Sequence, residues 1–190
     1  SKGVFKGGAS SAKKELSKFK RKIDSYDELR DFPAAEGTSN LSVYLRHGCL
    51  SIRELISFSQ KSSSKGSAIW LSELIWREFY QMILAQFPKV TKGPFKEKYK
   101  GISWVGGSKE FKAWCTGQTG FPLVDAAMRC LNATGTMPNR LRMVTASFLC
   151  KTLLVDWKKG EKYFARKLLD FDLAANNGGW QWSSSTGCDA

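Results

Sequence analysis

The sequence places one carboxylate and one guanidinium among large aromatic side chains on a single helical face. Trp70, Glu73, Arg77 and Tyr80 recur at spacings of three and four residues, so they share a face, and Trp76 follows Glu73 by three residues. A buried glutamate is costly unless it is paired. The pattern therefore fits both a structural Glu73–Arg77 pair and a polar site lined by aromatic rings, and the residues alone leave both open.

A second block with unusual chemistry spans residues 170–182, DFDLAANNGGWQW. Its polar side chains alternate with small apolar ones: Asp170, Asp172, Asn176 and Asn177. Carboxylates can hold arginine side chains or hydroxyl groups, and an asparagine amide offers a donor and an acceptor to the edge of a heterocycle. The Gly178-Gly179 pair predicts a bend or a close approach of the backbone to another group. No third ligand stands at a suitable spacing, so no metal site is predicted.

The elements that must position these residues are helical. Apolar spacing and end signals predict helices over residues 11–23, 51–60, 67–87, 122–135 and 140–154. Ser51-Ile-Arg-Glu54 is a capping-box pattern, and Pro122 and Gly135 mark the start and end of another helix. The lysine-rich connection over residues 89–112 is expected to be solvated surface. No window alternates with period two, so the predicted fold class is all-α.

The charge balance predicts an anionic partner. Of the 190 residues, 30 are Lys or Arg and 17 are Asp or Glu, which gives a net charge of +13. Eight of the basic residues stand in residues 1–22 against Glu15 alone. Such an excess favours polyanions or an anionic membrane surface. The seven Trp and 12 Phe residues add flat surface that suits nucleic acid or a flat cofactor.

Several function classes are excluded by composition. The five cysteines are odd in number and show no metal-ligand spacing, which argues against a disulfide framework or a zinc site and favours a reducing compartment. No apolar run is long enough for a membrane-spanning helix, and the basic N-terminal residues lack the apolar region of a secretory signal. His47 is the single histidine, placed before Gly48 as a surface residue at a helix end, so histidine-based catalysis is not expected.

Six motifs in series resemble the FAD-binding helical domain of the DNA photolyase/cryptochrome family. They are Arg30-Asp-Phe-Pro-Ala34 with Gly37-Thr-Ser-Asn-Leu-Ser42, Trp70 through Tyr80, Trp114 with Thr119-Gly-Phe-Pro122 and Val124-Asp-Ala126, Asn139-Arg-Leu-Arg-Met143, Asp156-Trp157, and residues 170–182. The resemblance covers residues 26–190. It divides the chain into a basic leader or linker helix over residues 1–25 and a partial FAD- and lesion-binding domain over residues 26–190, a multi-helix bundle truncated at its C-terminus.

The resemblance implies a bound FAD. Thr38, Ser39, Leu41 and Ser42 would face its diphosphate, as hydroxyl and backbone donors do at phosphate sites. Asn40 stands where the family often has arginine. The other implied cofactor contacts come from both ends of the chain: Tyr26, Trp70, Glu73, Arg142, Asp170, Asp172 and Asn176. Of these, Arg142 and Asp170 would form a pair beside the ring, and Asn176 would meet the isoalloxazine edge.

The resemblance also implies a cavity for a flipped-out pyrimidine dimer. Its catalytic residues would be Glu73, Trp76, Asn139, Met143 and Trp182. Contacts to bases or phosphates would come from Arg30, Glu73, Trp76, Arg77, Tyr80, Asn139 and Arg140. A tryptophan relay that carries electrons from the surface to the flavin would consist of Trp114, Trp157 and Trp180.

The function implied is light-dependent repair of cyclobutane pyrimidine dimers by electron transfer from reduced FAD, as in the class I photolyases. Asn176, where plant cryptochromes commonly have Asp, favours a photolyase-like flavin environment. Asn139 and Met143, where six-four enzymes have histidines, favour cyclobutane dimers. A cryptochrome-like blue-light photoreceptor and a non-catalytic DNA-binding remnant are the alternatives. Thr136-Met-Pro-Asn-Arg140 departs from the family's Trp-Met-His-Asn-Arg, which replaces an aromatic near the flavin by a hydroxyl and an imidazole by Pro138.

Family members also carry an N-terminal α/β domain with an antenna chromophore and a further C-terminal stretch. We therefore expect this chain to be a fragment of the catalytic domain. It should fold as a helical bundle, bind FAD weakly or not at all, and be inactive in isolation. The expected partner is DNA that contains pyrimidine dimers, and no association with a membrane is expected. The protein is expected to be a monomer in the cytoplasm.

Overall fold

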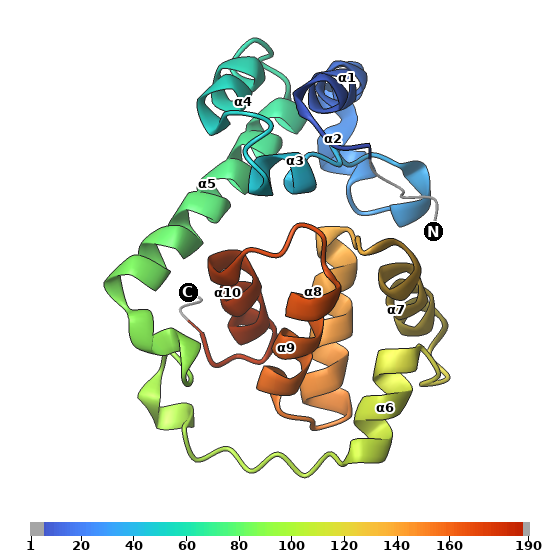
Figure 1. The fold of residues 1–190 in the computed structure, drawn as a ribbon, viewed down its shortest axis with the longest axis vertical. Helices are drawn as coiled ribbons and strands as arrows, with labels where there is room; N and C mark the ends of the chain where they lie inside the picture. Colours follow the sequence, from blue (N-terminus) through green and yellow to red (C-terminus); the bar gives the residue numbers. More distant parts are fainter. Residues whose placement is uncertain (1–5, 188–190) are drawn as a thin grey trace. The chain divides into compact units, whose positions relative to one another are not determined.

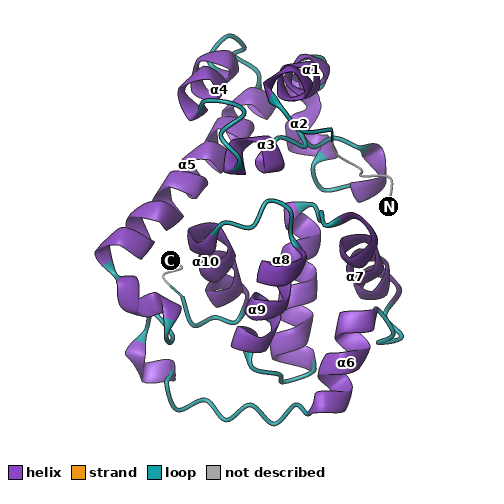
Figure 2. Cartoon of the chain, in the orientation of Figure 1, coloured by secondary structure: helices purple, strands orange, loops and turns teal. Residues whose placement is uncertain are grey.

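A computed structural model describes residues 6–187, and within this range every regular element is a helix (Figure 2). The α-helices are α1 Ala9–Phe19, α2 Tyr26–Leu29, α3 Ser42–Arg46, α4 Ile52–Ser59, α5 Lys65–Gln86, α6 Ser108–Thr116, α7 Pro122–Thr134, α8 Asn139–Ser147, α9 Trp157–Lys167 and α10 Leu173–Ser183. Short 3₁₀ turns cover Ile23–Ser25, Pro33–Ala35, Pro88–Thr91 and Glu97–Tyr99, and a π-helix covers Phe148–Thr152. The predicted all-α class is confirmed.

The chain forms two compact units that meet within α5, the first reaching Phe79 and the second beginning at Tyr80. In the first unit, α1 to α4 pack with the start of α5 around a core of aromatic rings. Phe19 lies 5.0 Å from Trp70 between ring centroids, and its ring meets Tyr26 edge-on at 5.8 Å. Phe19 is only 2% exposed. Ala12, Phe19 and Ile23, which lie within the predicted leader or linker of residues 1–25, are thus part of this core.

In the second unit, α10 packs against α9 and α8, and α7 packs against α6 and α8 (Figure 1). The core gathers around three completely or almost completely buried rings, those of Trp114, Phe164 and Trp180. Gly160 in α9 leaves room for one of them, because a Cβ at this position would lie 2.1 Å from a ring carbon of Trp180. No helix among residues 6–187 is long and apolar enough to cross a membrane.

Several local expectations are confirmed. Helix α7 begins at Pro122 and ends before Gly135, whose φ of 71° is left-handed. His47 follows the last residue of α3, is exposed and precedes Gly48 at a φ of 68°. Ser51 precedes α4 as expected, but its side chain forms no capping hydrogen bond.

Two expectations are wrong in detail, and a third is met in one of its two forms. The Gly178-Gly179 pair lies inside α10 rather than at a bend, but the predicted close approach is present at Gly178, where a Cβ would lie 2.1 Å from the ring of Tyr80. The connection over residues 89–112 is not only solvated surface, because it holds two 3₁₀ turns, the start of α6 and the buried Val90. The helix predicted over residues 140–154 changes from α to π at Phe148.

Candidate functional site

In the first unit, Glu73 forms an ion pair with Arg30. The guanidinium Nη1 of Arg30 donates to Glu73 Oε1 at 2.5 Å, and the two side chains are 21% and 33% exposed. Glu73 is carried by the long helix α5, while Arg30 directly follows α2. The Arg30 guanidinium also lies 5.8 Å from the centre of the Tyr26 ring. The carboxylate is therefore held by a cation that is distant in sequence, and it remains partly open to solvent.

Trp70 and Trp76 occupy different environments on α5. Trp70 is 3% exposed and meets Phe58 edge-on at 5.8 Å, so it belongs to the core of the first unit. Trp76 is 41% exposed and meets Phe79 edge-on at 5.3 Å. Arg77, beside it, is half-buried. Trp76 thus presents a large flat ring at the surface of this unit, which is the property that a stacking wall requires.

The segment from Gly37 to Ser42 leads into α3. Thr38 donates to the side-chain oxygen of Asn40 at 3.3 Å, and Asn40 has a left-handed φ of 55°. The hydroxyl-bearing residues are half-buried or exposed: Thr38, Ser39 and Ser42. Leu41 is different, because its side chain is 1% exposed within the core, so only its backbone could face a ligand. Its amide N–H donates to Ser39 Oγ at 3.4 Å.

In the second unit, Arg142 and Asp170 form an ion pair through one guanidinium nitrogen. The Nη2 of Arg142 donates to both carboxylate oxygens of Asp170 at 2.7 and 3.0 Å, and its Nε donates to the carbonyl of Met137 at 2.8 Å. The Asp170 side chain is 4% exposed, whereas that of Arg142 is 28% exposed. The predicted pairing is therefore present, although its place beside a flavin ring stays a prediction.

The carboxylate of Asp172, which directly precedes α10, accepts hydrogen bonds from a backbone N–H and from a side-chain amide. Asp172 accepts from the backbone N–H of Ala175 at 3.0 Å, which caps the helix. Both of its oxygens also accept from the side-chain amide of Gln81 at 2.9 Å. One turn further along, Asn176 donates to the backbone carbonyl of Glu161 at 3.1 Å. Burial raises the pKa of the Glu161 carboxyl above its ordinary value.

The proposed relay tryptophans belong to one aromatic core. The rings of Trp114 and Trp180 lie 5.9 Å apart between centroids, and Trp157 is buried in the same cluster. Trp114 donates its indole N–H to the backbone carbonyl of Thr145 at 3.0 Å. Among residues 6–187, the indole Nε1 of Trp180 is the one buried side-chain nitrogen or oxygen without a hydrogen-bond partner. All three rings are at most 3% exposed, while the half-buried Trp104 packs against their cluster.

The start of α8 carries two of the predicted lesion contacts. Asn139 is exposed and its amide lies 3.7 Å from the sulfur of Met143 one turn later. Pro138 stands immediately before the helix, where a backbone N–H has no helical partner, so its ring interrupts no hydrogen bond. Thr136, in place of the family's aromatic, shares a hydrogen bond of 2.9 Å with the hydroxyl of Thr134.

Two further residues of this unit that are predicted to contact the lesion or the DNA are at least partly accessible to solvent. Trp182, close to the end of α10, is 37% exposed. Arg140, the second residue of α8, is half-buried. Like Trp76 in the first unit, Trp182 offers an accessible flat ring.

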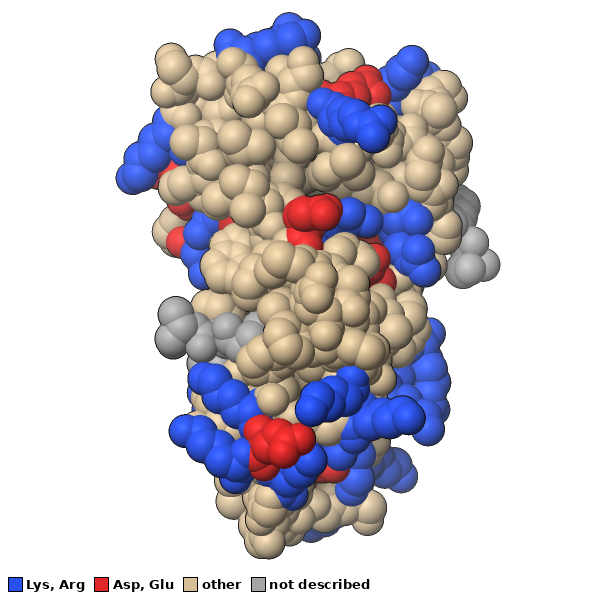
Figure 3. Space-filling view, turned by 90° about the vertical axis from the view of Figure 1, so that its left-hand side faces the viewer, with Lys and Arg blue, Asp and Glu red and all other residues tan. Residues whose placement is uncertain are grey.

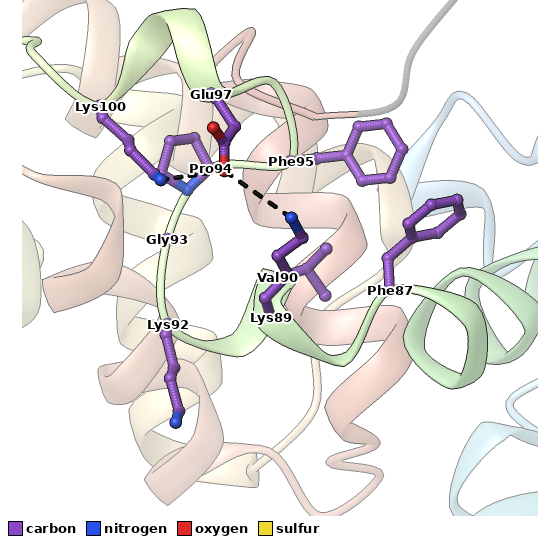
Figure 4. A pocket seen from close by; sticks show the side chains of 9 residues that line it. All are labelled: Phe87, Lys89, Val90, Lys92, Gly93, Pro94, Phe95, Glu97 and Lys100. Carbon is purple, nitrogen blue, oxygen red and sulfur yellow. Dashed lines mark hydrogen bonds and ion pairs between the residues drawn. The ribbon is translucent and has the colours of Figure 1, made fainter.

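A cavity of about 330 Å³ opens in the second unit beside the segment that connects α5 to α6. Figure 4 shows Lys89 and Lys100 turned toward Glu97 and Lys92 pointing away from them. Glu97 lies 3.0 Å from Lys100 and 3.8 Å from Lys89. No residue predicted to bind FAD or DNA lines this cavity. Basic side chains are numerous in the lower part of the face drawn in Figure 3.

The predicted residues thus fall into two groups that the fold assembles separately. The first unit holds Tyr26, Arg30, Thr38, Ser39, Asn40, Leu41, Ser42, Trp70, Glu73, Trp76 and Arg77. The second unit holds Tyr80, Trp114, Asn139, Arg140, Arg142, Met143, Trp157, Asp170, Asp172, Asn176, Trp180 and Trp182. The Arg30–Glu73 pairing and the packing of Trp104 against the aromatic core were not predicted, because local spacing carries no information on contacts between distant elements.

Residues 70–190 match the family described as the FAD binding domain of DNA photolyase. Over 176 residues the chain is 52% identical to the deoxyribodipyrimidine photo-lyase of Vibrio cholerae, a match that covers 90% of this chain and 38% of that protein. Over 171 residues it is 52% identical to the photo-lyase of the same name from Escherichia coli K12, covering 87% and 36%.

Solved structures give the same result. A bacterial class III photolyase from Agrobacterium tumefaciens superposes with a TM-score of 0.94 at 40% identity, over 98% of this chain and 40% of that one. A cryptochrome from Synechocystis sp. superposes with a TM-score of 0.89 at 34% identity, over 98% and 41%. The chain spans less than two fifths of the length of the two curated relatives named above. The family match covers well over half of the residues, and the chain belongs to the family of the FAD-binding domain of DNA photolyase.

Proposed function

We propose that this chain forms the FAD- and lesion-binding part of a photolyase that splits cyclobutane pyrimidine dimers in DNA under light. The observation that carries the proposal is the composition of α10. This one helix bears the half-buried Asn176, the buried Trp180 within an aromatic core, and the accessible ring of Trp182. These three side chains can respectively meet a flavin edge, transfer an electron and support a flat base.

The residues of both units fit FAD. Thr38, Ser39 and Ser42 supply hydroxyl groups suited to a diphosphate. The partnerless indole N–H of Trp180 is a donor that the protein leaves unsatisfied, and such groups are rare in folded chains. When bound, reduced FAD supplies the electron that opens the cyclobutane ring and receives it back afterwards.

The protein's own contribution is positioning and electrostatics. The Arg142–Asp170 pair holds a guanidinium in a fixed place without leaving a buried charge unpaired. Glu73 would accept hydrogen bonds from the bases of the dimer, and Arg30 keeps this carboxylate oriented. Trp76 and Trp182 would stack against the extruded bases, which stack well on aromatic side chains. Arg77, Tyr80, Asn139 and Arg140 would contact the DNA around them.

We further propose that electrons reach the flavin from the surface through the tryptophan core of the second unit. Trp114, Trp157 and Trp180 are all buried, so a relay made of these three alone would have no exposed end. Trp104 is half-buried and packs against the same cluster, so we assign the surface end to it. The charge of the second unit, 16 Lys and Arg against eight Asp and Glu, suits a polyanionic substrate.

The test is repair of a thymine-dimer oligonucleotide by the longer protein that we propose contains this segment. Loss of dimers under blue light and none in the dark supports the proposal, and equal dimer content in both conditions refutes it. The Glu73→Ala variant should repair far more slowly yet still bind undamaged duplex. Glu78→Ala, an exposed glutamate on the same helix, serves as the control. The cryptochrome alternative predicts a light-dependent flavin spectrum without repair.

A further inference from the structure

Helix α10 is attached to the segment before α6 by two buried amide side chains. Gln181 is 2% exposed and Asn177 is 3% exposed. The Nε2 of Gln181 lies within donating distance of the carbonyls of Val90 and Gly93, at 3.1 and 3.3 Å, and of Asn177 Oδ1 at 3.0 Å. Its Oε1 accepts from the backbone N–H of Phe95 at 2.7 Å. Asn177 Nδ2 also donates to Val90 O at 3.3 Å.

The attached segment has little regular structure of its own. Between the turns Pro88–Thr91 and Glu97–Tyr99, the backbone passes along the cavity drawn in Figure 4. Three of its groups that face α10 are bound by the side chain of Gln181, with Asn177 as a second donor to one of them: the carbonyls of Val90 and Gly93 and the N–H of Phe95. A buried donor or acceptor left without a partner costs about 1–3 kcal/mol. Gln181 therefore makes most of the side-chain hydrogen bonds that join this segment to α10 within the second unit.

The position of Gln181 in the sequence gives this attachment a functional meaning. It stands between Trp180, which is 2% exposed, and Trp182, which is 37% exposed. At 3.6 residues per turn, neighbouring side chains point about 100° apart, so rotating the helix would change the surroundings of both rings. The side chain that fixes the rotation at this point is Gln181.

Two other contacts fix the rest of the helix. Asp172 at its start is bound by the amide of Gln81. Near its middle, the backbone at Gly178 lies so close to the ring of Tyr80 that no side chain fits between them. With Gln181, the helix is held at three levels, and the last of them lies directly at the two tryptophans.

We propose that Gln181 is a positioning residue, which orients Trp180 for electron transfer and Trp182 for contact with the lesion by fixing the rotation of α10. The inference rests on the function proposed above for these two rings. It assigns no contact with substrate or cofactor to Gln181 itself.

The test compares Gln181→Glu with Gln181→Met. Glutamate keeps an oxygen for the N–H of Phe95 but directs a second oxygen at the carbonyls of Val90 and Gly93. Protonation of this buried carboxyl restores one hydrogen-bond donor, so the loss of attachment between α10 and the segment before α6 should reverse as pH falls. Methionine has a similar volume and no hydrogen-bond donor, so the loss of attachment in Gln181→Met should not depend on pH. Gln118→Glu makes the same chemical change at an exposed site and is the control.

Two measurements on the 190-residue chain need no cofactor. Near-ultraviolet circular dichroism reports the surroundings of the tryptophans, and amide hydrogen exchange reports the N–H of Phe95. At neutral pH both Gln181 variants should show an altered tryptophan signal and faster exchange at Phe95, while the control matches the wild type. Unchanged signals in both variants would overturn the proposal, whether or not the chain binds FAD.

A third measurement links the attachment to function in the longer, FAD-loaded protein. The rate of flavin photoreduction should fall roughly ten- to hundredfold in Gln181→Glu at neutral pH, since a displacement near 1 Å can have an effect of this size. The amount of bound FAD should stay unchanged, and the rate should recover at low pH. Faster Phe95 exchange with a normal photoreduction rate would refute the positioning role. If the wild-type protein shows no flavin photoreduction, only the proposed function is refuted.

Discussion

Gly160 in α9 allows the sharpest test of the packing around Trp180. A Cβ at this position would lie 2.1 and 2.5 Å from two carbons of the Trp180 ring and 2.6 Å from a methyl carbon of Leu149. Ordinary carbon contacts are about 3.5–4.0 Å, so the ring must move by more than about 1 Å. Overpacking of this kind costs about 1–3 kcal/mol, and alanine recovers about 1 kcal/mol of helix propensity. Gly160→Ala should therefore lower the free energy of unfolding by up to about 2 kcal/mol, with a central value of about 1 kcal/mol.

The same substitution should have a different effect once the ring is smaller. Trp180→Phe removes the distal ring atoms that meet the new methyl group, so Gly160→Ala added to it should cost about 0 kcal/mol or stabilise slightly. Urea unfolding of the wild type, both single variants and the double variant gives the coupling energy, expected near 2 kcal/mol. Gly179→Ala, where a Cβ meets nothing within 4 Å, should stabilise by a few tenths to about 1 kcal/mol. An equal cost of Gly160→Ala with tryptophan and with phenylalanine at position 180 would refute the reasoning.

Three further outcomes are expected. Asp170→Asn should lower the free energy of unfolding by about 2 kcal/mol, because Arg142 loses an anionic partner at 2.7 and 3.0 Å; a change below about 0.5 kcal/mol in urea unfolding would contradict this. Burial raises the pKa of the Cys150 thiol from 9.0 to about 12, so native Cys150 should resist iodoacetamide at about pH 8 while the exposed Cys130 reacts. Since the folded state holds this proton more tightly, its contribution to stability is complete below pH 9.0 and is lost as pH rises toward about 12. In the longer FAD-loaded protein, Trp180→Phe should block flavin photoreduction yet spare repair by chemically reduced protein, and unchanged photoreduction would exclude Trp180 from the relay.

Much of the helical architecture could be predicted from local signals. Pro122 and Gly135 define α7 through backbone preferences that act within a few residues. The pairing of Arg142 with Asp170 was also expected, from the family resemblance, and the structure contains it.

The remaining features depend on contacts between distant residues. Spacing offered Arg77 as the partner of Glu73, because residues four apart on a helix are neighbours. The structure pairs Glu73 with Arg30, 43 positions earlier in the chain. Likewise, two successive glycines predict a bend or a close approach, and only the folded unit shows that Gly178 makes the close approach and that its neighbour is the ring of Tyr80.

The packing of α1 determines where this protein can be shortened. A version that starts at residue 26 would follow the boundary of the motifs, yet it would lack the ring of Phe19, which touches Tyr26, Phe58 and Trp70. Deleting a buried phenylalanine ring alone costs about 3–5 kcal/mol, a large share of the stability of an ordinary domain. The exposed aromatic faces would then favour aggregation. Expression and trimming of this domain should therefore keep the residues from Ala9 onward.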